Sequence, residues 1–217
     1  MPDSLPDSSP VAGSWGVVVP VKRLELAKTR LTPYGEQARQ DLALAFAADV
    51  VEAARGAAQV LVVTDDERAA ARLSELGADV APDDPDAGLN PALAHGAAVA
   101  RRRFPREGVA LLSADLPALR PAELDAALAA AAGYGVAFVA DASGTGTTLL
   151  ATAPGRPVEP RYGRASAAAH RAAGAIELTG GWPSLRTDVD TAADLRTAAE
   201  LGLGPATSAW TARHAVA

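Results

Sequence analysis

The chain alternates short apolar runs with longer segments of helical character, and this alternation restricts its fold more than any other feature. The first run is "WGVVVPV" (Trp15–Val21), and "AQVLVVTDD" (Ala58–Asp66) and "GVALLSADLP" (Gly108–Pro117) follow it. Runs of this length, rich in Val and Leu and ended by proline or polar residues, predict buried strands. Strands that alternate with helices predict an α/β fold with a mostly parallel central sheet flanked by helices.

Further elements fit the same pattern. Helices are expected at residues 35–55, 67–76, 91–104 and 121–132, and a last helix, capped by Asp190 or Thr191, runs to Leu201. The neighbouring segments "GVAFVAD" and "TTLLAT" flank "ASGTG" and are expected to add an antiparallel edge to the sheet. "ADVAPD", "AIELTG" and "LRTDVD" are expected to form shorter strands.

The two ends of the chain are expected to lie outside the folded part. The start, "MPDSLPDSSPVAGS", is acidic and rich in Pro and Ser, and it lacks the positive region and apolar core of a signal peptide. We therefore expect a disordered tail over residues 1–14, one domain over 15–204 and a C-terminal tail over 205–217. No apolar run approaches the roughly 20 residues of a membrane span. These features predict a cytoplasmic protein.

Charge and residue usage exclude several classes of function. The net charge of −6 and the pI near 5.1 argue against nucleic-acid binding and against attachment to a membrane surface. The chain has no cysteine, which excludes disulfides, thiolate nucleophiles and Cys metal sites. His95 and His170 fall in alanine-rich helical segments and His214 lies near the end of the chain, so a Ser-His-Asp triad has little support.

The candidate site is the set of strand ends, because ligands of open α/β sheets bind beyond the carboxyl ends of the strands. These ends comprise residues 20–28, 64–66, 83–90, 113–117, 144–148 and 187–190. Asp115 follows one strand, and Asp188 and Asp190 stand two apart in another, so they share a face. Three carboxylates without His or Cys suit a hard ion such as Mg²⁺. The alternative is that each one caps a helix or sits in a solvated turn.

The first strand is followed by a basic loop that holds Lys22 and Lys28, the only two lysines of the chain, together with Arg23 and Arg30. Lysine is a compact charge on a flexible stem, whereas arginine is a rigid fork. Lysines at this place suit the phosphate oxygens of a triphosphate. The alternative is a solvated helix face, because "LELAKTRL" has helical spacing.

Two segments of small residues offer backbone N–H groups to anions, namely "GTGTTLL" (Gly144–Leu150) and "PRYGRAS" (Pro160–Ser166). Arg161 and Arg164 add positive charge to the second. "GLN" places Asn90 at a helix start, where its amide either reads a base or ribose or serves as a plain cap. No segment matches the phosphate-loop or dinucleotide patterns of glycines.

Taken together, "VPVKRLELAKTRL", "GLNPAL", "LLSADLPAL", "GTGTTLL", "RYGRASAAAH" and "LRTDVDTAADL" resemble the guanylyltransferases of deazaflavin coenzyme (F-420) biosynthesis. That family is similar to the wider group of nucleotidyltransferases with a Rossmann-like, GT-A-like fold. The resemblance runs from about Trp15 to Leu203. The first loop of the wider group is usually rich in glycine, and this chain departs from that pattern.

The resemblance implies transfer of GMP from GTP to a small phospho acid, with release of pyrophosphate. The acceptor is phosphoenolpyruvate in the bacterial branch, and 2-phospholactate or 3-phosphoglycerate in relatives. The chain is rich in Arg and Ala and poor in Lys, as in a high-GC bacterium, which favours phosphoenolpyruvate.

Family positions also imply roles for individual residues. Asp115, Asp188 and Asp190 would hold Mg²⁺, and Lys22, Lys28 and Arg30 would hold the β- and γ-phosphates. Thr148, Gly163 and Ser166 match the positions that hold the carboxylate of the acceptor, and Asn90 would face the guanosine. Lys22, Lys28 and Asp115 are the expected catalytic residues.

Other interpretations stay open at this point. One is transfer of another nucleotide, or to another acceptor, on the same scaffold. Another is a nucleotide-binding regulatory protein without catalysis, although such a protein need not keep every carboxylate. A glycosyltransferase would place its D-x-D motif at mid-chain, whereas here it lies late. The expected partners are GTP, the phospho acid and the downstream deazaflavin transferase, with the protein itself a monomer or homodimer.

Overall fold

The computed structural model describes residues 15–26, 31, 34–105 and 107–214. The expected N-terminal tail (1–14) and the candidate residues Lys28 and Arg30 lie outside the described residues. The strands of the described residues form one seven-stranded sheet in the order β3-β2-β1-β4-β6-β5-β7. Their bounds are β1 Trp15–Pro20, β2 Gln59–Val63, β3 Asp79–Ala81, β4 Gly108–Leu112, β5 Val136–Ala140, β6 Thr147–Thr152 and β7 Ile176–Glu177.

Helices connect these strands. They are the short 3-10 helix η1 Leu24–Leu26 and the α-helices α1 Glu36–Arg55, α2 Glu67–Glu75, α3 Leu89–Arg103, α4 Pro121–Ala131, α5 Ser166–Ala172, α6 Pro183–Arg186, α7 Ala192–Leu201 and α8 Pro205–His214. The expected alternation of strands and helices is confirmed. Within the described residues, no helix combines the length and the apolar character that crossing a membrane requires.

The sheet is mostly parallel, as expected, and β6 is the strand that runs against its neighbours. The expectation that the antiparallel pair would form an edge is wrong, because β6 lies between β4 and β5 inside the sheet. Its reversed direction brings the start of β6 to the edge where β4 ends. There the N–H of Ser113 donates to the C=O of Thr148 at 2.9 Å.

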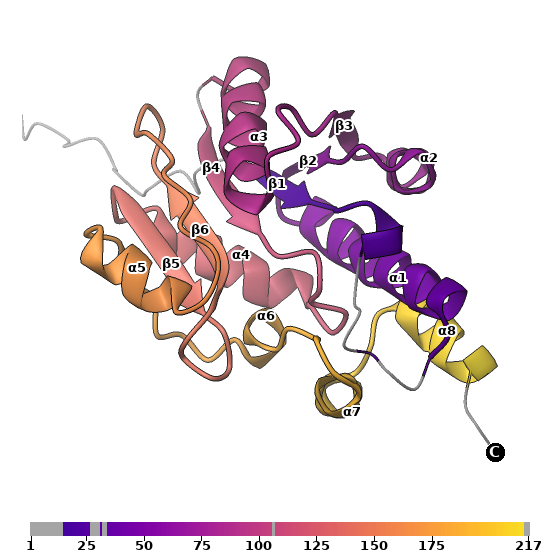
Figure 1. The fold of residues 1–217 in the computed structure, drawn as a ribbon. Helices are drawn as coiled ribbons and strands as arrows, with labels where there is room; N and C mark the ends of the chain where they lie inside the picture. The colour runs from indigo at the N-terminus through magenta and orange to yellow at the C-terminus, as the bar shows by residue number, and fades with distance from the viewer. Residues whose placement is uncertain (1–14, 27–30, 32–33, 106, 215–217) are drawn as a thin grey trace, which may run out of the picture.

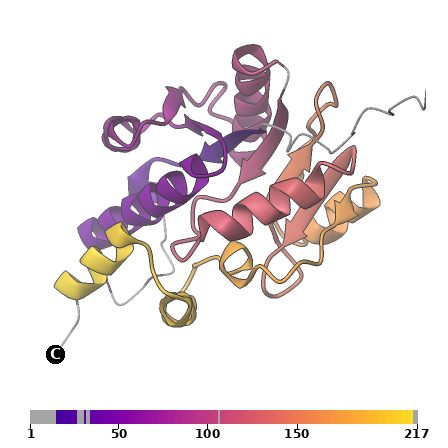
Figure 2. The same cartoon turned by 180° about the vertical axis from the view of Figure 1, so that it is seen from behind.

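Side chains of each inner strand alternate between two apolar layers. In β1, Val17 and Val19 face the layer that α1 and α4 cover, and Val18 faces the layer under α3 and α5. Figure 1 shows α3 and α5 on the near side, and Figure 2 shows α1 and α4 from behind. Helix α3 approaches the sheet closely at Gly96, where a Cβ would lie 2.6 Å from side-chain atoms of Val18 and Val63. The apolar layers therefore fix the strand ends from both sides.

Two segments near the C-terminus differ from expectation. The expected strand "LRTDVD" does not form, because α6 ends at Arg186 and an irregular stretch leads to α7, which Thr191 caps as anticipated. Residues 205–214, expected to belong to a tail, form α8 alongside α1, with Trp210 only 1% exposed. A single buried tryptophan in an otherwise small and polar segment is a weak signal in the sequence.

Candidate functional site

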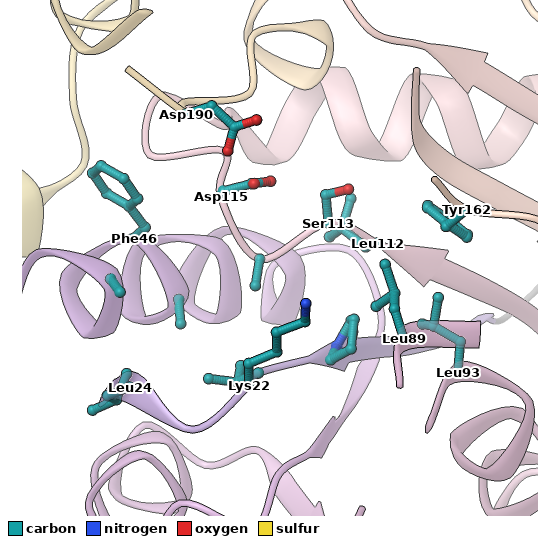
Figure 3. Close-up of a pocket in the computed structure, with 15 residues that line it drawn as sticks. Lys22, Leu24, Phe46, Leu89, Leu93, Leu112, Ser113, Asp115, Tyr162 and Asp190 are labelled. Carbon is teal, nitrogen blue, oxygen red and sulfur yellow. The ribbon is translucent and has the colours of Figure 1, made fainter. Parts of the chain in front are cut away.

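A cleft of about 280 Å³ opens beyond the ends of β1 and β4. Its lining includes Lys22 after β1, Ser113 and Asp115 after β4, Tyr162, and Asp190 from the loop before α7. Figure 3 shows the Lys22 side chain pointing into the cavity, with Asp115 and Asp190 on the opposite side. The structure thus brings residues far apart in the sequence to one edge of the sheet, as the strand-end rule predicts.

The three aspartates proposed as metal ligands lie in one electrostatic cluster. Val189, which is fully buried, donates its N–H to the C=O of Asp115 at 3.0 Å and so ties the two loops together. Burial raises the pKa of the Asp188 carboxyl to about 7, and the negative charges of Asp115, Asp141 and Asp190 add to that effect. Within the described part of the chain, the charged neighbours that shift the pKa of Asp188 are carboxylates.

Such a donor set fits a divalent cation, since oxygen ligands with excess negative charge are what Mg²⁺ prefers. A cation would favour the ionised form of Asp188, which burial and its neighbours disfavour. That these residues bind metal remains a prediction.

Asp141 was absent from the expected set. Its carboxylate accepts from the N–H of Thr145 and the hydroxyl of Ser143, both at 2.9 Å, and so closes the β5–β6 turn. It directly follows an apolar strand, the same signal that singled out Asp115.

A second chamber of about 220 Å³ adjoins the cleft and shares Lys22 with it. Asp65, Asp83 and Asp86 line it, and each offers a carboxylate oxygen within 4.8 Å of the others. Arg23 forms ion pairs with Asp86 at 3.1 Å and Asp65 at 3.8 Å. Sequence reasoning placed these residues among the strand ends and gave them no role.

One carboxylate of this chamber is not fully satisfied. Burial, followed by the charges of Asp65 and Asp86, raises the pKa of Asp83. Its Oδ1 is buried and has no hydrogen-bond partner among the described residues. The wall of the chamber therefore holds a buried acceptor that no donor among the described residues satisfies.

The residues expected to hold the acceptor lie around the start of α5 and β6. Thr148 is 1% exposed, and its hydroxyl has no hydrogen-bond partner in the described part of the chain. Ser166, 2% exposed, begins α5 and donates its N–H to the C=O of Gly163 at 3.2 Å. Gly163 has a φ of 135°, a conformation that residues with a Cβ rarely adopt. Contact with an acceptor remains a prediction for all three.

Asn90 has a protein partner that the sequence did not reveal. Its amide nitrogen donates to the C=O of Tyr162 at 2.9 Å, and its amide oxygen accepts from the N–H of Tyr162 at 2.8 Å. The partner lies 72 positions away. The side-chain amide of Asn90 is therefore hydrogen-bonded to the backbone of Tyr162. The expected contact with guanosine stays a prediction, and holding this backbone is an alternative role for Asn90.

His170 is buried at 1% exposure and contacts Thr147 and the backbone of Arg161. Burial, and then the charge of Arg161, lowers the pKa of its imidazole to about 4. His170 is therefore engaged with β6 and with the segment before α5.

Comparison with known proteins shows the family of this chain and its fold. The family model described as "Guanylyl transferase CofC like" matches residues 15–179. The phosphoenolpyruvate guanylyltransferase of Thermomonospora curvata is 60% identical over 204 residues, which cover 92% of this chain and 90% of that protein.

Solved structures show the same fold at lower identity. A putative nucleotide-diphospho-sugar transferase from Desulfovibrio desulfuricans superposes with a TM-score of 0.71 at 19% identity, over 94% of this chain and 96% of that one. A protein from Mycobacterium tuberculosis, solved in complex with manganese, gives a TM-score of 0.53 at 24% identity, over 87% of this chain and 98% of that one. With a family match over most of its length, a relative at 60% identity and a cleft at the expected strand ends, this chain belongs to the CofC-like guanylyl transferase family.

Proposed function

We propose that this protein transfers GMP from GTP to the phosphate of phosphoenolpyruvate, giving enolpyruvyl-2-diphospho-5'-guanosine and pyrophosphate. One observation carries the proposal beyond family membership: Lys22 faces Asp115 and Asp190 across a cleft at the strand ends. Such a site offers a cation on one side and metal-type oxygen ligands on the other. The relative at 60% identity bears the name of this reaction.

The reaction needs no general base, because the acceptor phosphate is already ionised near neutral pH. One of its oxygens attacks the α-phosphorus of GTP, and the bond from that phosphorus to the oxygen bridging to the β-phosphate breaks. The electron pair leaves with pyrophosphate. The protein must therefore hold two anions in line and balance the charge that develops on the leaving group. We assign the second task to Lys22, which lines the cleft, together with Lys28 and Arg30.

We assign Mg²⁺ to Asp115, Asp188 and Asp190. When bound, the ion supplies positive charge that offsets the repulsion between the acceptor phosphate and the α-phosphate. The chain's own contribution is to keep the two loops that carry the three aspartates next to each other. Buried Val189 and its hydrogen bond to Asp115 supply that order.

We assign the guanine base to the second chamber. Guanine presents two neighbouring donors, N1–H and the exocyclic amino group, which a carboxylate accepts as a pair, whereas adenine lacks this pair. We assign that contact to the carboxylate of Asp83, which lines the chamber and whose Oδ1 has no partner among the described residues. Because Lys22 borders both chambers, the triphosphate would run from the base past Lys22 toward Asp115.

The acceptor is assigned to Thr148, Gly163 and Ser166, and the whole reaction to coenzyme F-420 biosynthesis. The buried, unpartnered hydroxyl of Thr148 supports the first assignment, since such a group gains most from a ligand oxygen. The product would pass to the downstream deazaflavin transferase. A binding protein without catalysis is disfavoured, because all three acidic residues are present and clustered.

The proposal is tested by pyrophosphate release from purified protein with GTP and Mg²⁺. Phosphoenolpyruvate, 2-phospholactate and 3-phosphoglycerate are supplied in parallel, and ATP replaces GTP as the control. We expect release with GTP and phosphoenolpyruvate, and far less with ATP. Pyrophosphate release with only 2-phospholactate or only 3-phosphoglycerate would identify that compound as the acceptor in place of phosphoenolpyruvate. No release with any of them, from folded protein that binds GTP, would overturn the enzyme assignment.

A further inference from the structure

The segment from Ala153 to Ala165 contains no helix or strand, yet it places Tyr162 on the wall of the cleft. Outside regular structure, a backbone lacks the ladder of hydrogen bonds that would fix it. In this segment, the side chains of Asn90 and His170 form hydrogen bonds with the backbone of two consecutive residues, Arg161 and Tyr162.

Asn90, from the start of α3, pairs with Tyr162 as a neighbouring strand would. Its amide donates to the carbonyl of Tyr162 at 2.9 Å and accepts from the N–H of the same residue at 2.8 Å. Only a side chain with a donor and an acceptor on one planar group can satisfy both. Asn90 therefore fixes both the position and the orientation of this peptide.

His170, from α5, holds the preceding residue. Its Nε2 lies 3.0 Å from the N–H of Arg161, and because a backbone N–H can only donate, Nε2 is the unprotonated nitrogen. Nδ1 then carries the proton and donates to the hydroxyl oxygen of Thr147 at 2.9 Å. His170 thus links the cleft segment to β6.

The ring of Tyr162 adds a third fixed point. Its hydroxyl donates to the carbonyl of Leu111 in β4 at 2.9 Å, and the ring packs edge-on against His170 with centroids 5.3 Å apart. Burial raises the pKa of Tyr162, so the phenol stays a donor. The segment is therefore tied to α3, α5 and β4 within two residues.

We propose that Asn90 and His170 are positioning residues for the acceptor site, an inference that rests on the proposed function. Ser166 stands one helical turn before His170 on α5, and Thr148 follows Thr147 in β6, so His170 connects both halves of the assigned acceptor pocket. Asn90 and His170 together hold the backbone immediately before Gly163. Neither touches the reacting atoms in this role.

A positioning role for Asn90 and a contact of Asn90 with guanosine predict different kinetic effects when the side chain is replaced. If Asn90 read the base, its loss would weaken binding of GTP. If Asn90 positions the backbone before Gly163, its loss weakens binding of the phospho acid. The two KM values therefore separate the interpretations.

The test compares two matched pairs of variants in the full chain. Asn90→Leu keeps the size of the side chain and removes both hydrogen bonds, while Asn90→Asp keeps the acceptor alone. His170→Phe keeps a buried ring without a hydrogen-bonding nitrogen, while His170→Gln keeps a donor and an acceptor. The KM for phosphoenolpyruvate, the KM for GTP and kcat are measured for each, together with hydrogen exchange at the amides of Arg161 and Tyr162.

We expect Asn90→Leu and His170→Phe to raise the KM for phosphoenolpyruvate about tenfold and leave the KM for GTP within about twofold. Asn90→Asp and His170→Gln should recover part of the loss. A rise in the KM for GTP alone, or an equal rise in both, would overturn the inference, as would a His170→Phe enzyme that matches wild type.

Hydrogen exchange separates failure of this inference from failure of the proposed function. If the wild-type protein were inactive, the proposed function would be wrong. The hydrogen-exchange rates at Arg161 and Tyr162 would still show whether the two side chains hold this backbone. Faster exchange at Arg161 in His170→Phe and at Tyr162 in Asn90→Leu supports the inference. Unchanged exchange at both amides in the variants would contradict it.

Discussion

Asp49 in α1 and Asp188, two residues before the cleft residue Asp190, are aspartates of low exposure with opposite surroundings. Burial raises the pKa of both. The carboxylate of Asp49 accepts from the backbone N–H groups of Ala206 and Thr207 at 2.8 and 2.9 Å, and so caps the start of α8. The charge of Asp188 instead meets those of Asp115, Asp141 and Asp190.

This difference separates a structural carboxylate from a functional one. At Asp49 the protein itself supplies the hydrogen bonds that offset the cost of burial. Among the described residues, the side chains that shift the pKa of Asp188 increase that cost, and the lowering contribution comes from a backbone hydrogen bond. Groups next to a cleft whose pKa is strongly shifted are candidates for function for this reason. A bound cation would supply the missing compensation.

The largest expected effect follows from replacing Asp188. We expect Asp188→Asn to lower kcat/KM on the order of a thousandfold, because it removes a ligand of the proposed ion. The folded protein should be at least as stable as wild type, since like-charge repulsion is relieved. Steady-state kinetics and thermal unfolding check the two parts. Near-normal turnover of Asp188→Asn would show that Asp188 is not a functional carboxylate and would contradict the contrast with Asp49.

The converse change is at Asp49. Asp49→Ala leaves two backbone N–H groups at the start of α8 without their acceptor, and it should lower the free energy of unfolding by about 3 kcal/mol. Denaturant unfolding measures this loss. At a temperature where the variant is folded, its kcat/KM should equal that of wild type. A large kinetic defect with unchanged stability would assign Asp49 to the site instead.

His170 is a buried group whose titration should make the stability of the protein depend on pH. Its pKa in the folded protein is about 4, below the ordinary value of 6.5, so the unfolded chain binds a proton more readily between these values. Its contribution to stability is complete above about pH 6.5 and is lost as pH falls toward about 4. We expect the stability of wild type to drop by about 2 kcal/mol more than that of His170→Gln over this window. Parallel pH profiles would show that His170 is not held neutral.

The smallest effect concerns the base. Asp83→Asn removes a charged acceptor from the second chamber, and it should reduce the preference for GTP over ATP about tenfold by raising the KM for GTP. Competition assays with the two nucleotides measure this ratio. Asp86→Asn is the matched control, because Asp86 already pairs with Arg23 at 3.1 Å. An unchanged ratio in Asp83→Asn would remove the base from this chamber.

The sequence predicted most strands of the sheet and the approach of Asp115 to Asp188 and Asp190, although the expected strand around Asp188 does not form. Val-rich runs form strands, and Asp115 and Asp190 stand where strands or loops reach the edge of the sheet. Contacts between distant segments left no such pattern. Asn90 meets Tyr162 across 72 positions, and Asp49 caps a helix that begins more than 150 positions later. The missed helix α8 has the same cause, because its order depends on Asp49 and on the burial of Trp210.

The contrast between the two aspartates is tested most directly by the thermal stability of wild type, Asp188→Asn and Asp49→Asn with and without Mg²⁺, in the absence of nucleotide. We expect Mg²⁺ to raise the Tm of wild type and of Asp49→Asn, and to leave that of Asp188→Asn unchanged, because an ion that binds only the folded state stabilises it. An equal rise in all three proteins, or none in wild type, would contradict the assignment of a metal to the Asp115, Asp188 and Asp190 cluster.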